Sequence, residues 1–564
     1  MEISGGPSYV HGANSLPLLG LTIGQCLDRA AASVPDGEAL VVGWQNIRWT
    51  WRELKARADE FAAGLIALGL EPGDRLGIWV PNNAEWVVVQ LATASAGIIL
   101  VNINPAYRLP ELEYALNQTG CRALIVAEAL KSSNYIEMLN QLLPELANSE
   151  PGKLQSDKTP DLRWLIRLGD TQSPGMLNYR DVAGLASEND REKRDEISSS
   201  LQFDNAINIQ FTSGTTGTPK AATLTHHNIV NNAFFVGQRM KLSSLDRMCI
   251  PVPMYHCFGT VLGALTCLLH QATMVFSSES FNANAVLKTI EAEKCTILHG
   301  VPTMFIAELD DPDFGKFDLS SLRTGVMAGA PCPVELMKRV MGKMHMNEIT
   351  IAYGMTETSP VSFQTSVDDP LERRVTTVGQ VLPHIEIKIV DENGHVVARG
   401  TSGELLTRGY CVMPKYWNDP ERTAGAIDEA HWIASGDIAV LDDEGYCQIV
   451  GRIKDMVIRG GENIFPREIE EFLYTHPKIE EVEVFGVPDE KFGEEVCAWI
   501  KIKGGETVSA EEIRIFCTDE LAHFKIPRYI KFVDDFPMTV TGKVQKYIMR
   551  EQMAEELKLE EGTH

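Results

Sequence analysis

The stretch from Phe211 to Lys220 reads FTSGTTGTPK and combines five hydroxyl side chains, two glycines and a lysine. Backbone N–H groups and hydroxyls in such a loop can surround anionic oxygens, and the lysine supplies compensating positive charge. The spacing is not that of a P-loop, because Pro219 precedes Lys220 and Ala221 follows it. Taken alone, the stretch is either a phosphate-binding loop of another kind or a flexible surface turn.

Six further motifs follow this loop in order. They read PMYHCFG at 253–259, MAGAPCP at 327–333, AYGMTETSP at 352–360, ASGDIAVLDDEGYCQIVGRIKD at 434–455, RGGENIFPREIE at 459–470 and TVTGKVQK at 539–546. The ordered set resembles the adenylate-forming superfamily of acyl-CoA synthetases, nonribosomal adenylation domains and beetle luciferases. With YVHG near the N-terminus, NINPAYR, VPTMF and RGYCVM, the chain is similar to the acyl-CoA synthetase family member two group, whose usual substrates are medium-chain fatty acids.

The resemblance implies a reaction in two steps. A carboxylate attacks the α-phosphate of ATP and releases pyrophosphate, and the thiol of coenzyme A then displaces AMP from the acyl-adenylate. The enzyme must stabilise phosphoryl charge in the first step and admit a thiol in the second. We therefore expect a fatty acid–CoA ligase (AMP-forming) that acts on a small-molecule carboxylic acid and uses ATP, Mg²⁺ and coenzyme A.

The resemblance also implies which residues bind the nucleotide and coenzyme A. Tyr353 would stack on adenine, Asp437 would accept hydrogen bonds from the ribose hydroxyls, and Arg452 would lie beside it. Taken alone, Asp437 could be a turn aspartate and Arg452 a surface arginine. The other implied contacts are the phosphate loop (Thr212, Ser213, Gly214, Thr215, Thr216, Gly217 and Lys220), the adenine pocket (Gly329, Ala330, Pro331 and Gly354) and, beside the pantetheine channel, Gly460 and Gly461.

Four residues are implied to act in catalysis, namely Lys543, Thr356, Glu357 and His256. Lys543 would reach the α-phosphate and the reacting carboxylate, and Thr356 would bond a phosphate oxygen. Glu357 would carry the Mg²⁺ ion, which is commonly held by one or two carboxylates plus substrate phosphates. Taken alone, Thr356-Glu357 equally fits a helix N-terminal cap. His256 would gate the acyl pocket, although a hydrogen-bonded core histidine fits its context too.

Alternating helix and strand patterns must position these motifs. From Ile47 a short strand leads to a capping box at Thr50 and Glu53, apolar residues recur at helical spacing to Leu68, and the strand RLGIWV follows. The alternation recurs through GCRALIVAE and TVLGALTCLLHQATMVF. Such a pattern is typical of α/β layers around a largely parallel sheet. The polar, weakly periodic residues 145–200 are expected to be surface elaboration.

We predict a large N-terminal domain of layered α/β sub-domains at 1–453 and a small, mobile α+β C-terminal domain at 454–564. The glycines of VGRIKDMVIRGGEN mark the boundary, and beyond it the helices PREIEEFLYTH and SAEEIRIFCTDEL flank the strands EEVEVFGV and VCAWIKIK. By resemblance, Lys454 is the hinge about which the small domain swings. We also expect Lys543 to be accessible, so that acetylation would remove its charge.

Composition excludes some partners. The net charge of −26 argues against nucleic acid or an anionic membrane as a general partner, and the lack of an eighteen-residue apolar run predicts no transmembrane segment. The eleven scattered cysteines favour a reduced intracellular compartment. The cytoplasm is the expected location, or the mitochondrial matrix if a leader has been removed. A homodimer is compatible with these features.

Three other functions remain open on sequence alone. An adenylating enzyme could pass the acyl group to a carrier-protein thiol or an amine, although the chain shows no carrier segment. A luciferase-like oxidation of the adenylate would share the fold and the first step. A non-catalytic nucleotide-binding regulator is the third, and the presence of Lys543, Glu357 and Asp437 argues against it. The acyl chain length does not follow from the motifs.

Overall fold

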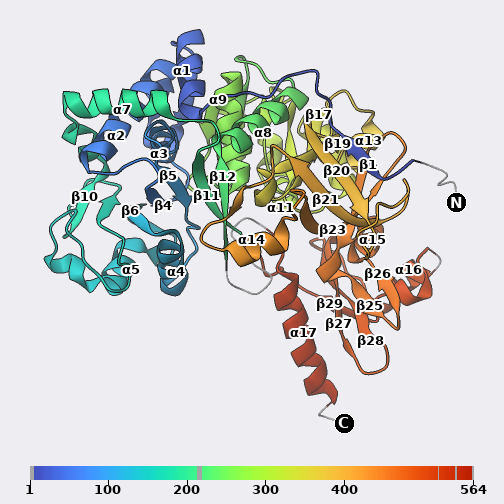
Figure 1. Cartoon of the computed structure of the whole chain (residues 1–564). Helices are drawn as coiled ribbons and strands as arrows, with labels where there is room; N and C mark the ends of the chain where they lie inside the picture. The colour runs from blue at the N-terminus through green and yellow to red at the C-terminus, as the bar shows by residue number, and fades with distance from the viewer. Residues whose placement is uncertain (1–5, 213–218, 519, 540–542, 562–564) are drawn as a thin grey trace.

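The computed structural model describes residues 6–212, 219–518, 520–539 and 543–561. Its N-terminal region contains two large mixed sheets and a five-stranded antiparallel sheet, each flanked by helices (Figure 1). The C-terminal region, coloured orange to red, has a sheet of its own and lies below them in this view. This arrangement confirms the predicted α/β architecture with a smaller C-terminal part.

Two of the predicted motifs lie at the ends of strands in the first large sheet. Its strands are β2 (Glu38–Val42), β3 (Ile47–Thr50), β13 (Arg247–Cys249), β14 (Thr273–Phe276), β15 (Ile297–Leu298), β16 (Thr324–Ala328), β17 (Glu348–Gly354), β18 (Val361–Gln364) and β19 (Gln380–Val381). They run in the order β19-β18-β17-β16-β15-β13-β14-β2-β3, parallel from β17 to β2. Because β16 and β17 are parallel neighbours, the segments that follow them emerge at one edge of the sheet.

The second large sheet ends in the hairpin that carries the threonine-rich loop. Its strands are β4 (Arg75–Trp79), β5 (Ile99–Asn102), β6 (Cys121–Val126), β9 (Trp164–Arg167), β10 (Met176–Asn178), β11 (Ala206–Thr212), β12 (Lys220–Thr225) and β22 (Lys415–Tyr416). They run in the order β10-β9-β6-β4-β5-β11-β12-β22. The expectation that residues 145–200 only elaborate the surface is wrong, because β9 pairs with β6 and buries Leu165 and Ile166.

Helices cover these sheets. They are α1 (Ile23–Ser33), α2 (Trp51–Ala67), α3 (Ala84–Ser95), α4 (Leu109–Thr119), α5 (Tyr135–Leu142), α6 (Tyr179–Val182), α7 (Glu188–Ser200), α8 (His226–Arg239), α9 (Thr266–His270), α10 (Ala283–Glu293), α11 (Pro302–Leu309), α12 (Val334–Lys343), α13 (Leu371–Thr376) and α14 (Pro420–Ala426). The predicted capping box of Thr50 and Glu53 begins α2, and Gly69 follows its end with φ of +82°. No described helix is long and apolar enough to cross a membrane.

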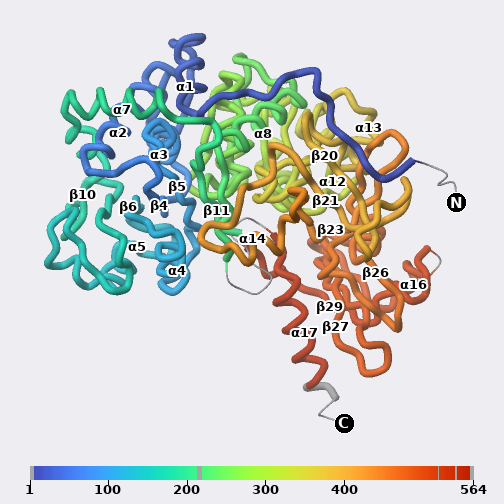
Figure 2. The backbone as a smooth tube through the Cα atoms, viewed as in Figure 1, coloured from blue at the N-terminus to red at the C-terminus, as the bar shows by residue number. Residues whose placement is uncertain are grey.

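The antiparallel sheet ties the chain's N-terminal segment to the middle of the sequence. Its strands are β1 (Tyr9–His11), β20 (Ile385–Val390), β21 (Gly403–Gly409), β23 (Ile433–Leu441) and β24 (Cys447–Arg452). Figure 2 shows the blue start of the chain lying beside β20, with which β1 pairs. In β23 and β24, Asp437 and Arg452 are direct partners, so the register of this sheet fixes their separation.

The C-terminal region has its own core. Its elements are β25 (Val457–Arg459), β26 (Glu462–Ile464), α15 (Pro466–Leu473), β27 (Ile479–Asp489), β28 (Gly493–Ile502), α16 (Ala510–Thr518), β29 (Tyr529–Phe532) and α17 (Lys546–Glu561). The two predicted helices and two predicted strands are among them. The large core of the N-terminal region extends to Cys447, and the next one begins at Val457. The domain boundary at 453/454 remains a proposal.

The core of the N-terminal region contains a carboxyl group that lacks a partner. Glu308 on α11 is 1% exposed, and neither of its carboxyl oxygens has a hydrogen-bond partner within the described structure. Burial raises the pKa of Glu308 well above its usual value. Since the folded-state pKa lies above the unfolded value of about 4.3, the stability contributed by this group is lost as the pH rises above that value.

We predict that Glu308→Met stabilises the protein at pH 7 by about 1–3 kcal/mol. The substitution replaces a buried carboxyl group that lacks a hydrogen-bond partner with an apolar side chain of similar length. The gain should shrink as the pH falls toward about 4.3, where both states carry the proton. Denaturant unfolding at several pH values measures this. The exposed Glu192→Met on α7 is the control, and a loss of stability in Glu308→Met at every pH would contradict the prediction.

Candidate active site

The ends of the threonine-rich loop lie side by side on an antiparallel hairpin. Thr212 at the end of β11 is paired with Lys220 at the start of β12. Thr212 Oγ1 donates a hydrogen bond to Glu357 Oε1 at 3.1 Å, and Lys220 Nζ lies 5.2 Å from the ring centroid of Tyr416. The predicted loop residues Ser213, Gly214, Thr215, Thr216 and Gly217 lie outside the described residues. The two described ends of the loop therefore lie near the segment that follows β17.

Glu357 is held firmly by one of its two carboxylate oxygens. Its side chain is 9% exposed, and Tyr416 Oη donates to the same Oε1 at 2.8 Å. The backbone carbonyl of Glu357 accepts from Met413 N–H at 2.9 Å. The helix-cap alternative for Thr356-Glu357 is wrong, because Thr356–Thr358 form a single 3₁₀ turn whose N-cap is Met355. Burial, followed by the charge of Glu357, raises the pKa of Tyr416, so its hydroxyl stays a donor.

The surroundings of Glu357 fit a magnesium ion that is shared with a substrate. No cluster of three or more histidine, cysteine or acidic side chains suited to a metal occurs in the part of the chain that is described. Among the described residues, Thr212 and Tyr416 donate their hydroxyls to Oε1 of Glu357 and none donates to Oε2, so Oε2 is suited to a ligand. One carboxylate oxygen is a usual protein contribution to Mg²⁺ when phosphates and water supply the rest.

Asp437 and Arg452 form a pair that also includes Tyr353. Arg452 Nε lies 3.1 Å from Asp437 Oδ1, and Tyr353 Oη donates to Asp437 Oδ2 at 2.5 Å. Asp437 is only 7% exposed, whereas the side chain of Arg452 is 54% exposed. Asp437 is thus a buried strand residue rather than a turn aspartate. Burial raises the pKa of Tyr353, and the Asp437 carboxylate raises it further.

Two glycines allow close approaches near Tyr353 and Lys543. A Cβ atom at Gly354 would lie 1.8 Å from the carbonyl oxygen of Pro360, so no larger residue fits there. Gly329 has φ of +91°, and a Cβ there would lie 3.8 Å from Lys543 Cε. Gly329 and the following Ala330 and Pro331 are exposed or half-buried, which leaves this segment free to line a pocket.

Lys543 crosses from the C-terminal region into this cluster. Burial lowers the pKa of its ammonium group, and Arg452 lowers it further, whereas Cys257, Asp437 and Glu357 act in the opposite direction. The expectation that Lys543 is accessible holds only in part for this arrangement, because the residue is half-buried against groups of the N-terminal region. An acetyl group would have to be added while the two regions are apart.

The structure brings together the predicted site residues Thr212, Lys220, Glu357, Tyr353, Asp437, Arg452 and Lys543. Comparison with known proteins supports the same assignment. The profile of the family described as "AMP-binding enzyme" matches residues 27–417, and that of "AMP-binding enzyme C-terminal domain" matches residues 468–543. The chain belongs to the AMP-binding enzyme family. The resemblance to adenylate-forming enzymes that the motifs predicted is therefore confirmed.

Relatives of the AMP-binding enzyme family match nearly the whole chain. The protein named "Medium-chain acyl-CoA ligase ACSF2, mitochondrial" from Mus musculus is 47% identical over 98% of this chain and 91% of its own length. The "Putative acyl-CoA synthetase YngI" of Bacillus subtilis is 50% identical over 95% of this chain and 98% of its own. The solved structure of the anthranilate CoA ligase AuaEII with anthranoyl-AMP is 26% identical, with a TM-score of 0.85 and coverage of 97% and 99%.

His256 and Cys257 of this AMP-binding enzyme lie next to the cluster. His256 Nδ1 accepts a hydrogen bond from Phe258 N–H at 3.2 Å, and burial together with Lys543 lowers the pKa of His256 to about 3. The imidazole is therefore neutral at physiological pH, and its role as a gate stays a prediction. Cys257 Sγ lies 3.7 Å from Thr356 Oγ1, and burial raises its pKa to about 11. A π-helix at Phe258–Leu265 follows.

The predicted hinge and the glycine pair belong to a different part of the AMP-binding enzyme. Lys454 lies exposed in a 3₁₀ turn at Ile453–Asp455. Gly460 and Gly461 have φ of +60° and +92° and form the two-residue turn between β25 and β26, where positive φ is required at both positions. No contact that the structure describes joins this turn to Lys543. Its part in a coenzyme A channel is a proposal that requires another arrangement of the two regions.

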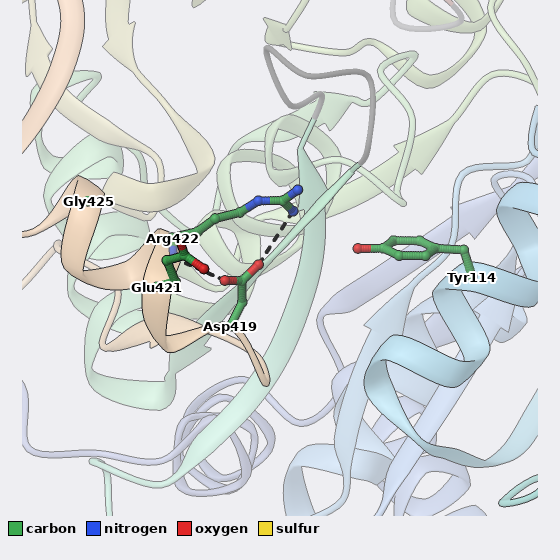
Figure 3. Close-up of a pocket in the computed structure, with 5 residues that line it drawn as sticks. All are labelled: Tyr114, Asp419, Glu421, Arg422 and Gly425. Carbon is green, nitrogen blue, oxygen red and sulfur yellow. Dashed lines mark hydrogen bonds and ion pairs between the residues drawn. The ribbon is translucent and has the colours of Figure 1, made fainter.

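An open hollow of about 670 Å³ lies close to Pro219, the first described residue after the threonine-rich loop (Figure 3). It is lined by Tyr114, Asp419, Glu421, Arg422 and Gly425. Tyr114 Oη donates to the carbonyl of Pro219 at 3.1 Å, which ties one wall of the hollow to the end of the loop. Arg422 Nη1 lies 3.4 Å from Asp419 Oδ2, so most of its charge is neutralised on the opposite wall.

Sequence patterns alone missed Tyr416 and the contact of Cys257 with Thr356. Tyr416 belongs to none of the motifs quoted above. It contacts Glu357, 59 residues away in the sequence, because β22 pairs with β12. Cys257 lies within PMYHCFG, but a small buried residue was the simpler interpretation there. The only signal was its position next to His256.

We predict that Tyr416→Phe weakens binding of ATP in the presence of Mg²⁺ by about tenfold, because a hydrogen bond to a buried carboxylate is worth roughly 1.5–3 kcal/mol. Binding without Mg²⁺ should change less. Calorimetry with ATP measures both values. Tyr446→Phe is the matched control, since Tyr446 Oη donates to Asp369 at 2.8 Å away from the cluster. Equal effects of the two variants would remove Tyr416 from the site.

Proposed function

We propose that the protein is an ATP-dependent acyl-CoA ligase that activates a medium-chain fatty acid as acyl-AMP and transfers the acyl group to coenzyme A. One observation supports this proposal above the others. The ammonium of Lys543, supplied by the C-terminal region, is enclosed among Asp437 and Glu357 of the N-terminal region. A non-catalytic nucleotide-binding regulator would have no use for a cation delivered there by a second region.

The first step requires charge at the α-phosphate. Lys543 would neutralise charge on the attacking carboxylate and the α-phosphate, and one unit charge at 4 Å is worth about 4 kcal/mol at an effective dielectric of 20. Thr356 would donate its hydroxyl to a phosphate oxygen, and Asp437 would fix the ribose. Glu357 would hold Mg²⁺ by Oε2. The bound ion would neutralise part of the charge of the phosphates.

The second step requires that Lys543 withdraw so that a thiol can enter. The enclosed Lys543 corresponds to the adenylating arrangement, and a swing about Lys454 would replace it with the Gly460-Gly461 turn beside coenzyme A. A hinge absorbs such a motion through large φ/ψ changes at few residues, which suits an exposed turn between two separate cores. The neutral His256 would then stand between the acyl group and the incoming thiol.

Location and assembly are parts of the proposal with less support. The name of the Mus musculus relative includes the word mitochondrial, whereas the name of the Bacillus subtilis relative gives no compartment. We retain the cytoplasm as the proposed location, with the mitochondrial matrix as the alternative. A homodimer also remains a proposal.

The test of this function is carboxylate-dependent exchange of pyrophosphate into ATP, measured with acids from acetate to palmitate and a few aromatic acids. We expect a maximum at medium chain length, and mass spectrometry should detect an acyl-CoA product only when coenzyme A is present. Exchange without a thioester would shift the acceptor to a carrier-protein thiol or an amine. Absence of exchange with every acid would refute the proposed function.

We further predict that Lys543→Ala slows adenylation by about 10²–10³-fold, the size of effect expected when an oxyanion donor is removed. Thioester formation from supplied acyl-AMP should fall much less, because Lys543 leaves the site before that step. Single-turnover assays of each half-reaction measure the two effects. The exposed Lys503→Ala is the control, and equal losses in both half-reactions would contradict the role of Lys543.

A further inference from the structure

Helix α15 of the C-terminal region contacts the N-terminal region through two charged side chains on one face. The Glu471 carboxylate lies close enough to the backbone N–H of Val334, the first residue of α12, for this group to lower its pKa, although burial raises the pKa overall. Arg467 Nη1 donates to the carbonyl of Ile449 in β24 at 3.0 Å, and Arg467 Nη2 lies 3.6 Å from Glu471 Oε1. The first N–H groups of a helix have no partner within the helix and attract negative charge. The N-cap of α12 is Pro333, which makes no side-chain cap, so the negative charge of Glu471 lies near a helix N-terminus that has no capping side chain of its own.

The contact lies at the base of the predicted adenine pocket. Cys332, two residues before α12, is close enough to Arg467 and Glu471 for both charges to affect its pKa. Its thiol faces the carbonyls of Met327 and Ala330, each at 3.5 Å. The outer face of α15 therefore docks where the Gly329–Pro331 segment joins α12.

The flank of α15 beside Arg467 and Glu471 holds the base of helix α17. Glu470 is buried, accepts from Val484 N–H at 2.8 Å and pairs with Lys546 Nζ. Lys546 also donates to the carbonyl of Val484 at 3.0 Å and lies 3.0 Å from Glu483 Oε2. Lys546 is the first residue of α17 and stands three positions after Lys543. Adjacent residues on α15 thus contact the N-terminal region, through Glu471, and the segment that carries Lys543, through Glu470.

Backbone contacts stiffen the short segment between Lys543 and α17. Lys543 N–H donates to Thr539 Oγ1 at 3.0 Å, and Gln545 N–H donates to the carbonyl of Pro537 at 2.8 Å. With Lys546 anchored at one end, a displacement of α15 must move Lys543 by a similar amount. The side chain of Lys543 reaches Gly329 only if α15 is seated on α12.

We propose that α15 is a positioning strut, which places Lys543 for adenylation through an outer contact, made by Glu471 and Arg467 with the N-terminal region, and an inner contact, made by Glu470 with Lys546 of α17. The proposal rests on the proposed function of the site. Loss of the outer contact shifts the population away from the docked arrangement. Adenylation slows as a result, and thioester formation, which uses another arrangement, does not.

The outer contact is tested by a graded pair of variants. Glu471→Lys places a positive charge at the N-terminus of α12 and should slow adenylation by about three- to tenfold, whereas Glu471→Gln keeps an acceptor oxygen and should slow it less. Thioester formation from supplied acyl-AMP should stay within about twofold for both. Glu468→Gln is the matched control, because Glu468 lies exposed on the same helix and pairs with Lys525 inside the C-terminal region. Equal slowing of both half-reactions by Glu471→Lys would overturn the proposal.

A distance measurement tests the strut without relying on activity. All eleven native cysteines are buried, so spin labels can be directed to cysteines introduced at the exposed Lys343 on α12 and Glu511 on α16. Double electron–electron resonance should show a docked population that falls in Glu471→Lys and persists in Glu468→Gln. An unchanged distance distribution in Glu471→Lys would refute the strut. If the unmodified enzyme exchanged no pyrophosphate with any acid, the proposed function would be refuted. The distance measurement would still show whether Glu471 holds α15 against the N-terminal region.

The inner contact is tested by replacing Lys546. Lys546→Met should slow adenylation with an unchanged docked population, because α15 still seats on α12 but no longer fixes the base of α17. Lys546→Arg keeps the charge and should recover most of the rate. Thermal unfolding confirms that both variants fold. A folded Lys546→Met with an unaltered adenylation rate would remove the inner contact from the strut.

Discussion

The electrostatics of one enclosed ammonium group constrain the whole active site. Burial and Arg452 disfavour the charged form of Lys543, and the carboxylates of Asp437 and Glu357 compensate only in part, so its pKa is lowered. The site therefore holds more positive charge than its own side chains stabilise, although the protein as a whole carries −26. A nucleotide's phosphates would supply the missing negative charge. Binding of a polyanion and docking of the lysine should accordingly favour one another.

No single sheet builds this site. The first large sheet contributes Tyr353 and Glu357, the second contributes Thr212 and Lys220, and the antiparallel sheet contributes Asp437 with Arg452. Hydrogen bonds between side chains from different sheets, such as Thr212 to Glu357 and Tyr353 to Asp437, hold the three edges at fixed separations. The C-terminal region then needs to provide only one correctly placed side chain.

Local patterns predicted local features well. The capping box at Thr50 begins α2 as expected, since its two partners are three residues apart and need no tertiary context. The exposure of Lys543 could not be predicted in this way, because it depends on how two regions dock. The contact of Tyr416 with Glu357 depends on a strand pairing between distant segments. Strand β9 was not recognised because its apolar run, residues 164–166, has only three residues between arginines. Sequence order predicted which motifs belong together, but not which side chains touch.

The burial of every cysteine has a chemical consequence for an enzyme whose proposed co-substrate is itself a thiol. Thiol–disulfide exchange needs an accessible thiolate, and burial raises the pKa of Cys257 to about 11 and that of Cys332 to about 12. Oxidised coenzyme A or glutathione would therefore find no ready partner on the folded chain. The enzyme can handle a reactive sulfur compound at its centre without forming mixed disulfides with it.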